Sequence, residues 1–244
     1  MARKYEKIAH ELREGITNGT YPPGSTLPAL PELMATYEVA RETVRSAVSA
    51  LANEGLVTPL SGVGTVVRDL GTVDMHSQPG DAHPAWGSTT GDDSKIETVE
   101  ASYDVANHEV AQRLGIGRGD RVVHRVRRYY KGRHIVLLHD QWLPGEVGAR
   151  IHSETGYDPA DKDAHERTDL YSFMREAGYQ PAQTTERVST RMPDPDERDV
   201  MSIPPGVPVL ITLRTTRDAS QIELETSTFV ATGDRAEQTY TVAM

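Results

Sequence analysis

The spacing of hydrophobic residues near the start of the chain predicts three helices followed by a β-hairpin. The first helix is predicted from apolar side chains that recur every three or four residues: Tyr5, Ile8, Ala9, Leu12 and Ile16. It ends before Gly19, and the prolines that follow exclude a longer helix. A short helix is predicted over 29–37, and a third over 41–53 with Gly55 as its C-terminal cap. Residues 56–69, LVTPLSGVGTVVRD, then predict the hairpin, so the outline is that of a winged helix-turn-helix.

The segment 69–94 differs in composition from the residues on either side. It is rich in Gly, Pro, Ser, Asp and Thr, and no apolar period is sustained along it. We therefore expect a linker at 69–94, between a first domain of residues 1–68 and a second domain of residues 95–244.

The second domain is predicted to combine strands with a few helices. Strands are expected where β-branched and aromatic residues concentrate: 121–130, 133–144, 183–193, 207–218, 222–232 and 239–242. Helices are expected over 107–116, 168–179 and 194–203. Lys131 and Gly132 predict a hairpin turn between the first two strands. Hairpin-linked strands pair antiparallel, so the predicted fold class is α+β with an antiparallel sheet.

The chain of 244 residues has a formal net charge of −10, which argues against non-specific binding to nucleic acid. Residues 1–70 contain seven Lys or Arg and eight Asp or Glu, so this segment is nearly neutral. Most of the negative charge of the chain therefore lies after it. Contact of this segment with nucleic acid therefore depends on where its few cations lie. No apolar run approaches the roughly 18 residues of a membrane span, and cysteine is absent. We expect a cytoplasmic protein that does not insert into a membrane.

The sequence lacks the motifs of common enzyme and metal sites. Its nine histidines include no HExxH pair, and His134 and His139 are predicted to point to opposite faces of a strand. There is no G-x-S-x-G nucleophile elbow, and SGVGT lacks the lysine and the length of a P-loop. We therefore expect no catalytic residues, no cofactor and no metal site.

Arg41 and Arg45 are four residues apart on the third predicted helix and form a stripe with Ser49. Two interpretations are open. The stripe is the solvated side of a helix that packs in the core, or it contacts DNA, because the second helix of a helix-turn-helix enters the major groove. An arginine there can bind guanine with two hydrogen bonds, and Thr43 or Ser46 can reach phosphates or bases.

A longer set of residues follows in order through 5–68: Tyr5, Ile8, Ala9, Leu12, Ile16, Gly19, Tyr21, Pro22, Pro23, Gly24, Leu27, Pro28, Glu32, Leu33, Arg41, Thr43, Val44, Arg45, Ala47, Leu51, Glu54, Gly55, Leu56, Gly62, Gly64 and Thr65. In this order the segment resembles the DNA-binding domain of the GntR family of bacterial transcription regulators. Together with the arginine stripe, the resemblance implies these DNA-contacting residues: Arg41, Thr43, Arg45, Ser46, Ser49, Gly62, Gly64 and Thr65. Two departures, Ala40 in place of Ser or Thr and Pro31 in place of a charged residue, each remove a contact that the family makes with DNA.

The second domain also contains an ordered set of residues: Ala111, Leu114, Gly115, Gly119, Asp120, Val122, Val123, Arg125, Arg127, Arg128, Tyr129, Gly132, Leu143, Pro144, Gly178, Tyr179, Glu186, Arg191, Met192, Pro193, Glu197, Ile203, Pro204, Gly206, Val207, Pro208, Val209, Leu210, Arg214, Glu223, Asp234 and Arg235. It resembles the UTRA ligand-sensing domain of the HutC-type branch of the same family. The resemblance implies an antiparallel sheet with helices, similar to chorismate lyase, that mediates dimerisation.

Arg125 and Arg127 are two residues apart on a predicted strand and therefore share one face, with Tyr129 beyond them. Two neighbouring arginines repel unless an anion, a carboxylate or solvent intervenes. One answer is a small anionic or hydroxylated effector, and the other is pairing with a carboxylate of the chain, from among Glu186, Glu223 and Glu225. The resemblance to family ligand pockets adds these effector-binding candidates: His139, Asp169, Glu223 and Phe229.

Together these features predict a homodimeric transcription regulator that represses from a palindromic operator and responds to a small effector. Two alternatives stay open from the sequence. The second domain serves only to dimerise a constitutive repressor, or it is an enzyme for a small carboxylate on a lyase-like fold. The fold by itself does not favour the enzyme, because fold does not determine function.

Overall fold

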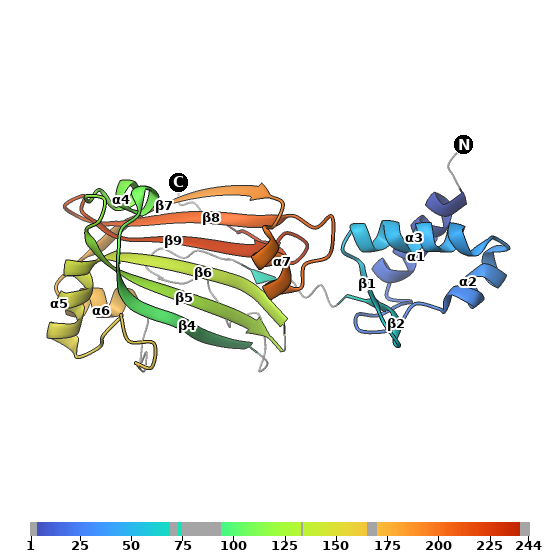
Figure 1. Ribbon diagram of the computed structural model, residues 1–244, viewed down its shortest axis with the longest axis horizontal. Coiled ribbons are helices and arrows are strands. Elements are labelled where there is room, and N and C mark those ends of the chain that lie inside the picture. Colours follow the sequence, from blue (N-terminus) through green and yellow to red (C-terminus); the bar gives the residue numbers. More distant parts are fainter. Residues whose placement is uncertain (1–3, 69–72, 75–93, 133, 165–169, 240–244) are drawn as a thin grey trace. The chain divides into compact units, whose positions relative to one another are not determined.

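The computed structural model describes residues 4–68, 73–74, 94–132, 134–164 and 170–239 (Figure 1). The chain divides into two units. One contains Met1–Gly71 and Met192–Pro208, and the other contains Thr72–Arg191 and Val209–Met244. The sequence-based limits of the domains and of the linker stay predictions.

The first unit contains the three helices and the hairpin that the hydrophobic pattern predicts. Its elements in chain order are α1 (Lys4–Thr17), α2 (Leu30–Tyr37), α3 (Arg41–Asn53), β1 (Val57–Leu60), β2 (Gly64–Val67) and, from the later segment, α7 (Pro195–Met201). β1 and β2 pair antiparallel. After α3, Gly55 has a φ of +75°, the left-handed conformation expected of a glycine that ends a helix.

One hydrophobic core holds α1, α2, α3 and the hairpin together. The third helix sends these residues into it: Val44, Ala47, Val48 and Leu51. They meet Ile8 and Leu12 of α1 and Leu33 of α2. Leu30 and Met34 pack at the margin of this core and are only partly buried. Because apolar side chains occupy one side of α3, its other side is left to polar and charged residues.

The second unit is built on a six-stranded antiparallel sheet, as predicted. Its strands, in spatial order, are β4 (Ser94–Val105), β5 (Arg121–Lys131), β6 (His134–Pro144), β9 (Glu223–Thr232), β8 (Val209–Asp218) and β7 (Pro181–Arg191), as Figure 1 shows. Two short strands, β3 (Val73–Asp74) and β10 (Ala236–Glu237), pair parallel to each other.

Helices cover the two faces of the six-stranded sheet unequally. α5 (Gly145–Thr155) and α6 (Leu170–Glu176) form a hydrophobic cluster with Val123 and Leu143, at one end of one face. α4 (His108–Leu114) packs against Val122 and Trp142 on the opposite face. Because side chains alternate along a strand, the two sets lie on opposite sides of the same two strands, β5 and β6.

Four elements of the second unit are not predicted from the sequence: the strands β3, β4 and β10, and the helix α5. α5 carries Gly145 and Gly148, which weaken a helical pattern. The packing requires both, since a Cβ at Gly145 would lie 2.7 Å from the carbonyl oxygen of Arg121. The strand predicted at 239–242 is not seen at Thr239, and residues 240–242 lie outside the described residues.

Candidate functional site

The exposed side of α3 presents the arginine stripe. Arg41, Arg45 and Ser49 are exposed, while Thr43 and Ser46 are half-buried beside them. The Arg45 side chain is 63% exposed, and its Nη1 lies 3.9 Å from Oε2 of Glu42. A pair this exposed holds the guanidinium weakly, so Arg45 can reorient toward a ligand.

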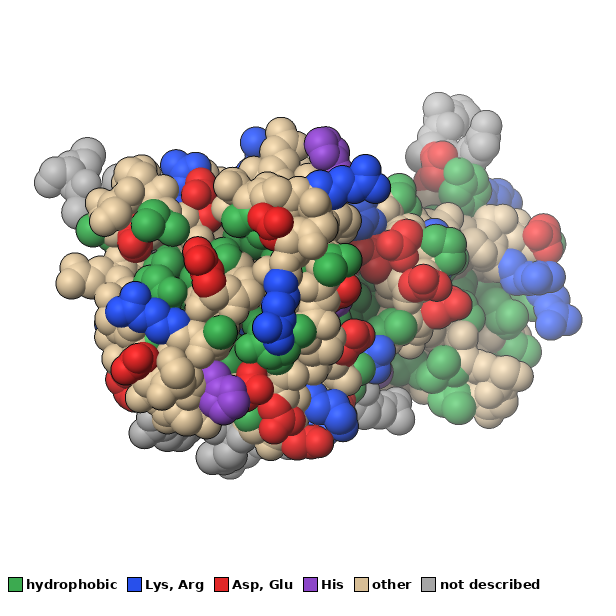
Figure 2. All heavy atoms as spheres, turned by 60° about the vertical axis from the view of Figure 1, so that its left-hand side comes forward, with side chains coloured by type: hydrophobic (Ala, Val, Ile, Leu, Met, Phe, Trp, Pro, Cys, Tyr) green, Lys and Arg blue, Asp and Glu red, His purple; other side chains and the backbone are tan. Residues whose placement is uncertain are grey.

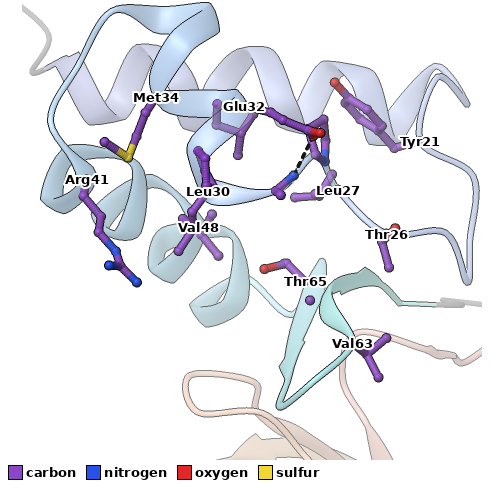
Figure 3. A pocket seen from close by; sticks show the side chains of 15 residues that line it. Tyr21, Thr26, Leu27, Leu30, Glu32, Met34, Arg41, Val48, Val63 and Thr65 are labelled. Atoms are coloured by element: carbon purple, nitrogen blue, oxygen red, sulfur yellow. Dashed lines mark hydrogen bonds between the residues drawn. The ribbon is translucent and has the colours of Figure 1, made fainter.

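A concave surface of about 930 Å³ lies between α2, α3 and the hairpin. Figure 3 shows Arg41 reaching toward it from α3, and Thr65 and Val63 approaching it from the hairpin. Gly64 also lines this surface. The fold therefore brings Arg41 of α3 and the consecutive residues Gly64 and Thr65 of β2 to one concavity.

The turn of the hairpin owes its shape to two glycines. Gly62 has a φ of +77° and Gly64 a φ of +118°, conformations that other residues adopt only with strain. No neighbouring atom lies within 4 Å of a Cβ built at either position, so the backbone of this turn is open to approach. Val63 between them is 62% exposed. The predicted DNA contacts of Gly62 and Gly64 thus lie on an exposed hairpin turn whose backbone conformation favours glycine.

The two departures from the family pattern lie at helix starts. Ala40 precedes α3 without a side-chain cap, because its methyl group has no acceptor. Pro31 occupies the first turn of α2, where Glu32 turns back on its own helix and accepts a hydrogen bond from the backbone N–H of Ala29 at 2.9 Å. Neither Ala40 nor Pro31 has a side chain that can donate to a phosphate.

The second unit contains a buried polar network on the face of the sheet that carries α5 and α6. We define its polar face by these buried residues of four adjacent strands: Arg125, Arg127, His139, Gln141, Thr212, Arg214, Thr216, Glu225 and Ser227. Arg127 lies directly opposite His139, and His139 lies directly opposite Phe229 on the next strand. The register thus agrees with the predicted sharing of one face by Arg125 and Arg127.

The guanidinium of Arg125 is connected to the carboxylate of Glu225 through Gln141. Arg125 donates from Nη1 to Oε1 of Gln141 at 2.9 Å and from Nη2 to the hydroxyl of Tyr157 at 2.7 Å. Gln141 in turn donates from Nε2 to Oε2 of Glu225 at 2.5 Å. Tyr171 of α6 donates to the other oxygen of Glu225 at 2.7 Å. Burial first, and then the nearby charge of Glu225, raises the pKa of Tyr171 well above its ordinary value.

Arg214 forms a buried ion pair at the other side of this network. Its Nη2 lies 2.7 Å from Oε1 of Glu186, and the two side chains are 2% and 7% exposed. Burial opposes the charge of Arg214, but Tyr171, Glu225 and Glu186 outweigh burial and raise its pKa. The guanidinium also lies over the ring of Phe229, 4.9 Å from its centroid. The cation therefore contacts both a carboxylate and an aromatic ring.

Of the six effector-binding candidates, four come together, one lies apart and one lies outside the described residues. Arg125, Arg127, His139 and Phe229 lie on the polar face, where His139 stacks on Phe229 at 4.1 Å and its Nε2 lies 3.0 Å from the hydroxyl oxygen of Ser227. Glu223 lies apart, beside Gly115 at the end of α4, with its Oε1 3.0 Å from Nη2 of Arg217. Asp169 lies outside the described residues.

The network also includes residues that were not predicted as candidates: Gln141, Tyr157, Tyr171, Arg214 and Ser227. Two of the carboxylates proposed as arginine partners, Glu186 and Glu225, belong to it, while the third does not. Alternation along β8 could have indicated Arg214, because it shares one side of that strand with Thr212 and Thr216.

Charges are mixed over the surface. Figure 2 shows Lys and Arg side chains scattered among Asp and Glu side chains on the face in view. Within the described residues, His, Asp and Glu side chains do not gather in threes that could hold a metal ion. No helix in the described part of the chain is long and apolar enough to cross a membrane.

Comparison with known proteins finds a matching protein family for each of the two parts of the chain. Residues 4–67 match the model of the bacterial regulatory proteins of the gntR family, and residues 89–237 match that of the UTRA domain. A helix-turn-helix transcriptional regulator of Streptomyces coelicolor is 31% identical over 256 residues, covering 98% of this chain and 92% of the relative. The transcriptional repressor NagR of Bacillus subtilis is 25% identical over 244 residues, covering 95% and 91%.

A solved structure of a GntR-family transcriptional regulator has the same fold, with a TM-score of 0.60 at 23% identity over 99% of this chain and 98% of that one. The relatives are transcription regulators, which agrees with the expectation of a protein that is not an enzyme. The chain therefore belongs to the GntR family of bacterial transcription regulators, with a helix-turn-helix DNA-binding domain and a UTRA domain.

Proposed function

We propose that the protein is a cytoplasmic repressor of the HutC-type branch. It binds a palindromic operator as a homodimer, and a small anionic or hydroxylated effector in the UTRA domain changes its affinity for DNA. Two-fold symmetry in the protein matches two-fold symmetry in the operator. The match to NagR covers 95% of this chain, and NagR is named as a repressor. This supports repression, rather than activation, by the present protein.

The convergence of predicted DNA-contacting residues on one concave surface carries the proposal. Arg41, Gly64 and Thr65 line the same concavity, and Arg45 lies one helical turn beyond Arg41. In this arrangement α3 enters the major groove, where Arg45 binds base edges, and the exposed tip at Gly62 reaches the adjacent backbone. The net charge of −10 leaves these few cations to supply the attraction for phosphates.

The buried charges of the second unit support an effector site on the polar face. Buried charges are stable only when they are paired or hydrogen-bonded, and the network here is assembled from five strands and from α6. An anion or a polyol that takes over part of these hydrogen bonds rearranges side chains on several elements at once. Differential binding to two such arrangements is what allows an effector to shift DNA affinity.

DNA binding is tested with the purified chain and DNA from upstream of its own gene, by fluorescence anisotropy. Arg45→Ala is expected to abolish specific binding, because it removes the main base contact. Lys7→Ala is the matched control, since it removes one exposed positive charge from α1 of the same unit. Unchanged specific binding by Arg45→Ala would remove α3 as the recognition helix.

Effector binding is tested by thermal shift with a panel of sugar phosphates and hydroxylated carboxylates. A compound that raises the melting temperature of the wild-type chain should lose this effect in Arg127→Met. It should also change the affinity for DNA. Compounds that bind without altering DNA affinity would instead support a constitutive repressor whose second domain only dimerises.

A further inference from the structure

A short joint connects the helix α3 to the hairpin. α3 ends at Asn53 and β1 begins at Val57, so we define the joint as residues 54–56. Its middle residue, Gly55, has a φ of +75°. Glycine has more backbone freedom than any other residue, so the joint bends at this point unless further contacts hold it. The angle between the two elements with predicted DNA contacts is set here.

Arg68, the residue after the end of β2, holds two consecutive carbonyl groups of the joint. Its backbone N–H donates to the carbonyl oxygen of Leu56 at 3.0 Å. Its side chain turns back and donates from Nη1 to the carbonyl oxygen of Gly55, also at 3.0 Å. Arg68 is only 8% exposed, although its guanidinium is always charged. The chain therefore buries a cation at the end of α3.

A cation at this place has two interpretations. The C-terminal end of a helix carries a partial negative charge, so Arg68 stabilises α3 as a cap. A cap alone, however, leaves the angle between the helix and the hairpin unaffected. Arg68 differs from such a cap because its backbone continues the pairing of β2 with the chain before β1, while its side chain binds Gly55. It thus connects the base of the hairpin to the end of the helix.

The hairpin also packs on α3 through apolar side chains. Val57 and Val67 share a core with Leu51 of α3. Apolar packing has no preferred direction, so it brings the two elements together without fixing their angle. The backbone of β2 bonds within its own small sheet, to β1 and from the N–H of Val67 to the carbonyl oxygen of Ser25. Hydrogen bonds are directional, and those of Arg68 act on the joint itself.

We propose that Arg68 is a positioning residue for DNA recognition, which fixes the angle between α3 and the hairpin so that both contact one operator half-site together. The inference rests on the DNA binding of the proposed function, from which it takes α3 and the hairpin as the contacting elements. Arg68 acts through the joint and not by touching DNA. Without its side chain the joint bends at Gly55, so that α3 keeps its base contacts and the hairpin moves away from the DNA backbone.

A double-mutant cycle in the full chain tests this role, with fluorescence anisotropy on DNA from upstream of its own gene. Thr65→Val removes a hydroxyl of β2 that faces the concave surface and should weaken specific binding by the wild-type chain about fivefold. Arg68→Met keeps an unbranched side chain in the buried space but loses the charge and the donors. In the Arg68→Met background, Thr65→Val should cost less than about twofold, because the hairpin has already left the DNA.

Arg68→Lys provides a milder variant that keeps the charge and one donor without the fork of the guanidinium. In this background Thr65→Val should cost about threefold, between its cost in the wild type and in Arg68→Met. Melting temperatures show which variants are folded at the temperature of the assay. Where Arg68→Met is not folded, Arg68→Lys decides, and an undiminished fivefold cost in it would overturn the inference.

Arg13→Met is the matched control. Arg13 also holds the joint, through the side chain of Glu54, but it belongs to α1 and not to the hairpin. Thr65→Val should therefore still cost about fivefold in this background. A cost reduced as much by Arg13→Met as by Arg68→Met would show that any contact at the end of α3 has this effect, and would overturn the specific role of Arg68.

Failure of this inference can be told apart from failure of the proposed function. The same cost of Thr65→Val in wild type and in folded Arg68→Met would exclude the positioning role and leave DNA binding by the hairpin intact. Specific binding that is absent from the wild-type chain, or unchanged by Thr65→Val in it, would contradict the proposed DNA contacts themselves.

Discussion

Gln141 donates a hydrogen bond from its amide nitrogen to Oε2 of Glu225, and both side chains are completely buried. The same carboxylate accepts hydrogen bonds from Tyr171, Thr216 and Ser227. Glu225→Gln replaces one acceptor oxygen by a donor and removes the charge. We expect this variant to lower the free energy of unfolding by about 3 kcal/mol, because buried donors lose a charged partner.

Urea unfolding of the second unit, followed by circular dichroism, measures this loss. Glu154→Gln makes the same chemical change at an exposed position of α5 and should alter stability little. A loss below about 1 kcal/mol in Glu225→Gln would mean that the network rearranges around a neutral side chain.

Tyr171 predicts a loss of stability at high pH. Its pKa is raised well above 10 in the folded chain, by burial first and by Glu225 second. The neutral phenol is therefore favoured by folding, and this contribution is complete below the unfolded pKa near 10. As the pH rises beyond that value, the unfolded chain ionises first, and stability falls by up to about 1.4 kcal/mol per pH unit until the folded pKa is reached.

Denaturation at several pH values between about 9 and 11 checks this dependence, in the range where an ordinary tyrosine ionises. Tyr171→Phe should unfold with a shallower dependence on pH, since no phenol remains at that position. Tyr130→Phe is the comparison, because Tyr130 is less buried and its pKa is raised chiefly by its hydrogen bond to Glu97. Equal slopes for wild type and Tyr171→Phe would contradict the assignment.

A side chain at Gly148 is expected to clash where α5 packs on the sheet. A Cβ at this position would lie 2.5 Å from Cγ2 of Val123. Gly148→Ala gains helix propensity of about 1 kcal/mol, but overpacking in a core costs about 1–3 kcal/mol. We expect a net destabilisation, measured by urea unfolding, that becomes smaller in a Val123→Ala background. The same destabilisation in both backgrounds would show that Val123 is not the cause.

The ion pair between Arg13 of α1 and Glu54 after α3 is expected to add a modest coupling energy to the stability of the first unit. Arg13 donates from Nε at 2.8 Å and from Nη2 at 2.6 Å to the two carboxylate oxygens, and this hydrogen bonding is the largest cause that raises its pKa. Because both side chains are more than one-third exposed, a double-mutant cycle should give only about 0.5–1 kcal/mol. The longer and more exposed pair of Lys7 and Glu11 should give less. Equal coupling for both pairs would show that the two-oxygen geometry adds nothing.

The sequence predicts α1 and α3 of the first unit well because both helices are amphipathic and a glycine, Gly19 or Gly55, follows each of them. It predicts the shared face of Arg125 and Arg127 for a similar reason, since alternation along one strand is a local property. Gln141 and Glu225 could not be paired in the same way. They lie on β6 and β9, neighbours in the sheet but 84 residues apart in the chain.

The position of Glu223 was not predictable from alternation along its strand, because the pairing of that strand is locally irregular. It has the same spacing along the strand as Glu225, so strict alternation predicts that both carboxylates share one face. A register shift between Thr216 and Arg217 of the neighbouring strand breaks this relationship, and Glu223 pairs with Arg217. Nothing in the residue types at that point signals the shift.

Glu42 predicts a gain in DNA affinity. Its carboxylate is 82% exposed in the first turn of α3, 3.9 Å from the guanidinium of Arg45. In the proposed complex it lies near phosphates and repels them, and it also competes with DNA for Arg45. Glu42→Gln should therefore tighten operator binding about fivefold at low salt, about 1 kcal/mol, and the gain should shrink as salt screens the repulsion. Fluorescence anisotropy at about 50 and 200 mM salt measures both effects, with Glu6→Gln on α1 as the control of equal charge. Unchanged or weaker binding by Glu42→Gln would place the first turn of α3 away from the DNA backbone.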